Sequence, residues 1–210
     1  MSIVTYNNRS IRNISAIPGA AKSLTHIKTL TASSSATLSF VNGSDDVVLD
    51  STYPIYLFKL INLHTGTDDA QIEVGFRDGS TDYDATKTTS NFRAYHFERD
   101  LSGDNGLGYQ TGRDLAQSTA FQPLGQPQSS QDNDSSGSGE LYLFNPSSTT
   151  FIKHFIGHYS NHYTYNAPGV IDNYSAGYCN TTTAIDAVQF KMDSGNIDSG
   201  TIKLYGIKGS

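Results

Sequence analysis

The feature that most constrains this chain is a succession of short segments in which apolar and polar residues alternate, each followed by turn residues. In QIEVGFR (71–77) the three apolar residues fall on one face, and Asp78-Gly79 follows at once. Alternation with a period of two indicates a strand with one buried face, and Asp-Gly favours a tight turn. The pattern predicts β-structure and leaves little room for helices.

Segments of this kind follow one another from residue 24 to the end of the chain. The most apolar run, 53–63, is rich in β-branched and aromatic residues and predicts a strand buried on both faces. We expect about ten strands, at 24–30, 36–41, 46–49, 53–63, 71–77, 92–98, 140–144, 150–159, 184–192 and 200–207. Strands of this length at short spacing predict an all-β fold, a jelly-roll-like antiparallel β-sandwich. The expected core residues are Leu38, Phe40, Ile55, Leu57, Ile72, Val74, Phe76, Leu141, Leu143, Val188, Phe190 and Leu204.

Two segments depart from the alternating pattern. Residues 1–22 hold spaced isoleucines among Asn, Ser and Arg and predict an extended N-terminal arm that packs on the body or on a neighbouring subunit. Residues 100–139 are rich in Gly, Ser and Gln and predict a long loop with one helical turn at 114–121. The expected organisation is therefore an arm over 1–22 and a β-sandwich domain over 23–210 that contains this loop.

Length and charge exclude several classes of protein. The 210 residues suit one domain with an arm. With 14 Lys and Arg against 20 Asp and Glu, we expect no nucleic-acid partner, because a phosphate backbone requires a basic face. The sequence contains no run of about 18 apolar residues, so we expect no membrane span. The first residues lack the apolar segment of a signal peptide, so we expect none. Cys179 is the single cysteine, which excludes an intrachain disulfide and a cysteine-based zinc site.

Two patterns suggest metal binding, and in both the simpler interpretation is preferred. His154, His158 and His162 are four residues apart, but on a strand consecutive members would be separated by roughly 13 Å. The segment 78–84 places oxygen ligands at alternate positions, as calcium loops do, yet it lacks the glycine and final glutamate of an EF-hand. We therefore predict no metal and no cofactor, with the histidines on an aromatic strand and 78–84 at a solvated hairpin tip.

Catalytic motifs are also missing from the sequence. It contains no GxSxG, no phosphate-binding loop and no dinucleotide-binding GxGxxG. A glycoside hydrolase needs two carboxylates a few ångströms apart, and the sequence does not pair the candidates Glu98, Asp100 and Glu140. We predict that the protein is not an enzyme and assign no catalytic residue.

The stretch 159–178 is unusually rich in tyrosine, which supplies rigid contact area with a hydroxyl group. It predicts a subunit interface or a sugar-binding surface, with core packing of some of these side chains as the alternative. The candidate contact residues are Tyr159, Tyr163, Tyr165, Tyr174 and Tyr178. The candidate assembly residues of the arm are Ile3, Val4, Ile11, Ile14 and Ile17.

Three stretches carry a family resemblance: IPGAAKSLTHIKTLTASSSATLSFVNG (17–43), LYLFNPSSTTFIKHFIGHYS (141–160) and AIDAVQFKMDSGNIDSGTIKLYGIK (184–208). They resemble small virion structural proteins, tail- or fibre-associated, of marine and freshwater tailed bacteriophages. The resemblance covers most of the chain as a pattern of strands and turns and carries no catalytic motif. It implies a virion structural protein that is made without a signal peptide and released by lysis.

The sequence thus predicts a non-enzymatic structural protein that forms a homo-oligomer, such as a trimer or a filament, in a virion or an extracellular assembly. Other virion proteins or host-surface glycans are the expected further partners. Three alternatives remain open: a capsid decoration or cement protein, a filament subunit built by N-terminal strand addition, and a carbohydrate-active enzyme on the same scaffold.

Overall fold

A computed structural model describes residues 24–99, 101–127, 132–164 and 167–208. Within these ranges the chain forms twelve strands and no helix, which confirms the predicted all-β fold. The strands are β1 (Leu24–Thr31), β2 (Leu38–Val41), β3 (Ile55–Thr65), β4 (Ile72–Arg77), β5 (Lys87–Phe97), β6 (Asn105–Tyr109), β7 (Gln122–Pro123), β8 (Gly137–Phe144), β9 (Lys153–Tyr163), β10 (Gly169–Cys179), β11 (Ala187–Met192) and β12 (Ile197–Ile207).

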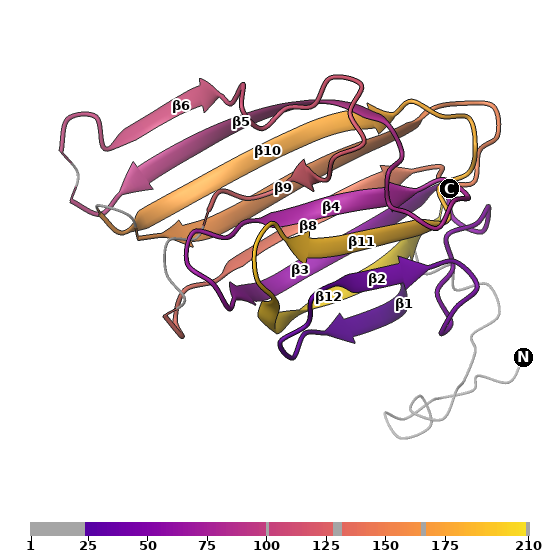
Figure 1. The fold of residues 1–210 in the computed structure, drawn as a ribbon, viewed down its shortest axis with the longest axis horizontal. Coiled ribbons are helices and arrows are strands. Elements are labelled where there is room, and N and C mark those ends of the chain that lie inside the picture. The colour runs from indigo at the N-terminus through magenta and orange to yellow at the C-terminus, as the bar shows by residue number, and fades with distance from the viewer. Residues whose placement is uncertain (1–23, 100, 128–131, 165–166, 209–210) are drawn as a thin grey trace, which may run out of the picture.

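The strands make two antiparallel sheets that form a β-sandwich (Figure 1). The larger sheet has the order β1-β12-β3-β8-β9-β10-β5-β6, and the smaller has the order β2-β11-β4-β7. Aromatic rings from both sheets meet in the core: Phe58 of β3 lies 5.2 Å from Phe40 of β2 and 5.5 Å from Phe190 of β11, between ring centroids. The apolar positions of the alternating segments therefore do converge between the sheets.

Burial follows the predicted core closely. Every residue expected in the core is buried except Ile55, which is half-buried. On β3 the alternation turns Tyr56 and Phe58 into the sandwich, so Ile55 and Leu57 face the opposite side. Leu57 is nevertheless buried, because it pairs with Tyr142 on one side and Tyr205 on the other. This part of β3 is thus buried on both faces, as its unbroken apolar run predicted.

Strands β9, β10, β5 and β6 extend the larger sheet beyond β8 (Figure 1). Their inner face carries buried polar side chains beside Phe155, Tyr159 and Ile171 and is covered by residues 110–127, which we call the cover segment. Gln126 of this segment donates from Nε2 to Oδ1 of buried Asn173 at 3.1 Å. Farther along, the Thr89 hydroxyl donates to Oε1 of Gln122 at 2.6 Å. Buried amides and hydroxyls therefore replace apolar packing here, and each needs its partner.

Three local predictions were wrong. Residues 46–49 form no strand, since the backbone nitrogen of Leu49 donates to Oδ1 of Asn42 at 2.9 Å and a turn competes with pairing. Residues 114–121 form no helical turn, because the backbone nitrogen of Leu115 donates to the Thr89 hydroxyl at 2.8 Å and Ser118 pairs with Lys87. The predicted loop 100–139 contains β6, β7 and the start of β8.

The arm and its residues Ile3, Val4, Ile11, Ile14 and Ile17 lie outside the described residues.

Candidate functional site: the open face of the larger sheet

The smaller sheet and the cover segment occupy one face of the larger sheet, and we call the other its open face. Alternation along each strand decides which side chains reach it. Phe92 of β5, Tyr174 of β10 and His158 of β9 are direct cross-strand partners there, and we call them the aromatic row. Glu140 of β8 and Lys59 of β3 continue the same line across the sheet.

Large apolar side chains are exposed on the part of the open face formed by β9, β10, β5 and β6. We call this set the apolar patch: Phe92, Leu107, Tyr109, Ile156, Val170 and Tyr174. Their exposed fractions run from 36% for Tyr174 to 74% for Leu107. Register makes the centre of the patch continuous, because Tyr109 lies beside Phe92 and Phe92 beside Tyr174, whereas Val170 lies between His96 and His162. Contiguous apolar surface of this kind usually marks a binding site, since water solvates it poorly.

The aromatic row is stacked within itself. The Tyr174 ring lies 4.9 Å from Phe92 at an interplanar angle of 7° and 4.4 Å from His158 at 10°. His158 Nε2 is also 2.7 Å from Oδ1 of Asp172, and a hydrogen bond to Asp172 raises the pKa of the Tyr174 hydroxyl. Both faces of Tyr174 are therefore covered, and its ring edge is what remains for a partner. A sugar ring stacks on an aromatic face, so the row suits protein contact better than sugar stacking.

The half of the open face toward β1 is more polar. Lys59 donates to Oε2 of Glu140, and this hydrogen bond raises the pKa of the lysine. Lys203 of β12 is the cross-strand partner of Lys59. The face thus combines an apolar half with a half that carries two lysines and one glutamate.

Histidines are concentrated on this face. Of the six histidines in the chain, five have open-face positions: His26 on β1, His96 on β5, and His154, His158 and His162 on β9. The sixth, His64, is buried, with Nδ1 2.6 Å from the carbonyl oxygen of Ser135. No group of three His, Cys, Asp or Glu side chains that could hold a metal occurs among the described residues.

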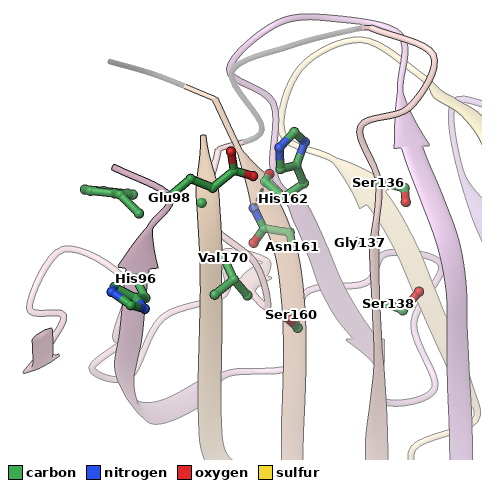
Figure 2. A pocket seen from close by; sticks show the side chains of 11 residues that line it. His96, Glu98, Ser136, Gly137, Ser138, Ser160, Asn161, His162 and Val170 are labelled. Atoms are coloured by element: carbon green, nitrogen blue, oxygen red, sulfur yellow. Dashed lines mark hydrogen bonds between the residues drawn. The ribbon is translucent and has the colours of Figure 1, made fainter. Parts of the chain in front are cut away.

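Two hollows lie on the open face, one on each side of the aromatic row. The first has a volume of about 660 Å³ and is lined by polar groups of β8 and β9, including Ser138, Ser160 and His162. Figure 2 shows Glu98 and His162 at its upper rim, with Val170 below them. The second, of about 570 Å³, lies around Ala176 and is bordered by Ile156. Both hollows are shallow and open, and the aromatic row forms a ridge between them.

The five tyrosines predicted as contact residues have different positions. Tyr174 and Tyr178 lie on the open face, with Tyr174 exposed and Tyr178 half-buried. Tyr163 is half-buried and stacks on Phe97 with centroids 5.6 Å apart. The prediction is wrong for Tyr159, which is 3% exposed because alternation on β9 turns it inward. Tyr165 lies outside the described residues.

Sequence reasoning missed most of the apolar patch. Phe92, Leu107, Tyr109, Ile156 and Val170 come from four strands, and only the pairing order brings them together. One signal was available: Ile156 alternates with His154 and His158 in the aromatic-rich strand 150–159, so it shares their face.

The remaining candidate groups are the segment 78–84, the single cysteine and Asp100. In the segment 78–84 the Ser80 hydroxyl lies 3.0 Å from the carbonyl oxygen of Asp82 and 3.3 Å from Oδ1 of Asp84. Cys179 is fully buried, and burial raises the pKa of its thiol to about 12. Its strand partners Lys87 and Lys153 are also buried, which lowers the pKa of both amines. Asp100 lies outside the described residues.

Comparison of the chain with protein-family models, with curated proteins and with solved structures found no match. The described part of the chain has no helix with the length and apolar character needed to cross a membrane.

Proposed function

We propose that this chain is a non-enzymatic structural subunit that self-assembles through the open face of its larger sheet, as a tail- or fibre-associated component of a phage virion. The observation that carries the proposal is the apolar patch, six large exposed side chains gathered on four neighbouring strands. The resemblance of the sequence to virion proteins supports the setting, a virion or another extracellular assembly.

The order of the strands supports a jelly-roll assignment. Strands β1 to β4 alternate between the two sheets, and so do β7, β8, β11 and β12. Together they give β1-β12-β3-β8 opposite β2-β11-β4-β7, an order that supports a jelly roll, the architecture found in viral capsid and lectin domains. The pairs β5–β6 and β9–β10 are then insertions that widen one sheet. The apolar patch lies entirely on these insertions, as expected for a surface added to a structural scaffold.

The size of the open face suits a second copy of the chain as its occupant. Eight strands spaced ~4.8 Å apart, with the longest of 11 residues, span roughly 34 Å by 36 Å, or about 1,200 Å². A stable complex buries about 800 Å² on each partner. An isologous contact uses the same patch on both subunits, so the apolar halves of two faces would meet. Because that half alone is smaller than about 800 Å², the contact would extend onto β8 and β3.

The test is the mass of the full-length protein in solution, beside a variant that carries both Phe92→Lys and Ile156→Lys. We expect a wild-type mass that is a multiple of 22.8 kDa and a monomeric double variant, because two buried lysines would face each other across the contact. Phe151→Lys is the matched control, since Phe151 is 68% exposed and precedes β9. A monomeric wild-type protein, or a double variant with the wild-type mass, would contradict the proposal.

The arm would add to this contact rather than replace it. In the proposal Ile3, Val4, Ile11, Ile14 and Ile17 anchor residues 1–22 on a neighbouring subunit and set whether the assembly closes as a trimer or continues as a filament. A capsid decoration or cement protein is the alternative setting for the same contacts. Binding to empty capsids would favour that setting, and binding to host cells would favour the tail.

The first hollow supports a second candidate function, contact with host-surface glycans. Its lining offers hydroxyl and imidazole groups from Ser138, Ser160 and His162, and the Glu98 carboxylate stands at the rim. Groups of this kind hydrogen-bond to sugar hydroxyls. Titration with purified host lipopolysaccharide should give saturable heat with the wild-type protein and none with His162→Ala. Equal binding by both proteins would place any glycan contact elsewhere.

A further inference from the structure

We propose that the contact between open faces is sensitive to acid and dissociates when the histidines on the face become protonated. This inference rests on the proposed function, because it requires two open faces in contact. It starts from the five histidines on this face, which are spread over three strands.

The neighbours of each histidine define the charges that it meets. His26 lies beside Tyr205, with ring centroids 5.4 Å apart, and His154 lies 6.0 Å from Tyr178. His158 stacks on Tyr174 and contacts Asp172. His96 and His162 are the two cross-strand neighbours of Val170, and both line the first hollow together with Glu98.

The remaining charged groups of the face come from the strands beside these histidines. The cations are Lys59 on β3 and Lys203 on β12. The anions are Glu140 on β8 and Asp172 on β10, with Glu98 and Asp114 at the rim. The ion pair of Arg99 with Asp104 also lies at this rim, and Asp104 interacts electrostatically with His96. Three cations therefore meet five carboxylates at neutral pH, and the face carries a small negative charge. Five protonated histidines would reverse the sign and leave a strongly cationic surface.

An isologous contact doubles the effect, because a two-fold axis places each patch against its own copy. Every cation gained on one subunit is gained on the other, and the histidines of β5 and β9 lie across the same buried layer, whereas His26 on β1 adds to the charge from the edge of the sheet. Like charges placed together at an interface oppose association strongly. Histidine is the side chain whose charge ordinarily changes between pH 5 and pH 8, so association should be complete at pH 8 and weakened at pH 5.

The experiment measures the mass and the dissociation constant of the full-length protein by sedimentation at pH 8 and pH 5. We expect association at pH 8 and a dissociation constant raised roughly tenfold or more at pH 5, the size of effect that interface charges produce. Adding salt to about 1 M at pH 5 should restore association, because it shortens the screening length to about 3 Å. Circular dichroism at both pH values reports whether the fold is kept.

A variant with glutamine in place of His26, His96, His154, His158 and His162 is the decisive comparison. It should associate at pH 8 as the wild-type protein does and stay associated at pH 5. Dissociation of this variant in acid would overturn the inference, as would a wild-type assembly that is unchanged at pH 5. A wild-type protein that is monomeric already at pH 8 would instead reject the proposed function, so the two failures are distinguishable.

Discussion

The side chain of Tyr159 fills space that glycines leave on the inner side of the larger sheet. A Cβ atom at Gly125 or Gly137 would lie within 3.0 Å of side-chain atoms of Tyr159, so a larger residue at these positions would displace the ring. At Gly139 a Cβ atom would also clash with the backbone oxygen of His158. The hydroxyl is buried and has no hydrogen-bond partner among the described residues. The ring therefore stabilises the fold by packing, while the hydroxyl contributes only the cost of its desolvation.

Tyr159→Phe and Tyr159→Ala should consequently have opposite effects. Tyr159→Phe removes an unsatisfied hydroxyl and should leave the free energy of unfolding unchanged or raise it by up to about 1 kcal/mol. Tyr159→Ala creates a cavity and should lower it by about 3–5 kcal/mol. Urea denaturation followed by fluorescence measures both. A clear loss of stability in Tyr159→Phe would show that the hydroxyl has a bonding partner.

Tyr159 also marks what sequence reasoning could and could not provide at this scale. The alternation of residues 150–159 can be seen in the sequence. Which of the two alternating sets of side chains points inward depends on where the second sheet and the cover segment lie. The many tyrosines of residues 159–178 suggested a contact surface, but the side chain of Tyr159 lies in the core. On β3 both faces are apolar, so the sequence predicted burial of Leu57 correctly without indicating which face it occupies.

Among the structural elements, the cover segment determines the stability of the sheet extension. Its Gln126 side chain connects buried Asn173 with Arg93, whose Nη1 donates to Oε1 of Gln126 at 2.9 Å. Gln126→Ala would leave both partners without this bond and should lower the free energy of unfolding by about 1–3 kcal/mol. Hydrogen exchange over 110–127 should increase as well. Thr119→Ala is the control, because Thr119 lies in the same segment and is exposed.

A Gln126→Ala variant as stable as Thr119→Ala would show that the polar interior does not depend on the cover segment. The sequence did not indicate this element, because pairing with β5 replaces the helical turn expected at 114–121. Strands β6 and β10 were missed for a related reason. Asn105–Tyr109 holds two glycines and favours a loop on local propensity, and it becomes a strand because β5 offers it a partner.

For the whole molecule, the order of the strands determines which side chains share a face, and this order could not be predicted from the sequence. A sandwich followed from strand count and spacing, and the described residues confirm it. The candidate contact surface did not follow, because its six members are scattered from Phe92 to Tyr174 along the chain. The long-range pairing β8-β9-β10-β5-β6 assembles them, and no local pattern encodes that order. The arm stays a prediction, since it lies outside the described residues.

Charge distribution gives the arm its clearest expected role. Residues 1–23 contain Arg9, Arg12 and Lys22 and no acidic residue. With 14 basic and 20 acidic residues in the chain, the remainder carries 11 and 20 and is strongly acidic. The segment leads into β1, which forms one edge of the larger sheet, and within the described residues no strand pairs with the outer side of β1 or β6. Such edges accept an added strand from another chain.

Deleting residues 1–22 should therefore leave the fold and the contact between open faces intact while abolishing larger assemblies. The thermal midpoint of the truncated protein should match that of the full chain, because the described core is built without the arm. Light-scattering mass should fall to that of two truncated chains, and negative-stain images should lose any rings or fibres that the full chain forms. At high salt the mass of the full chain should move toward that of the truncated protein, since screening weakens the attraction between a basic arm and an acidic body. If the truncated protein forms the same assemblies as the full chain, the arm has no part in assembly and the open face alone must account for it.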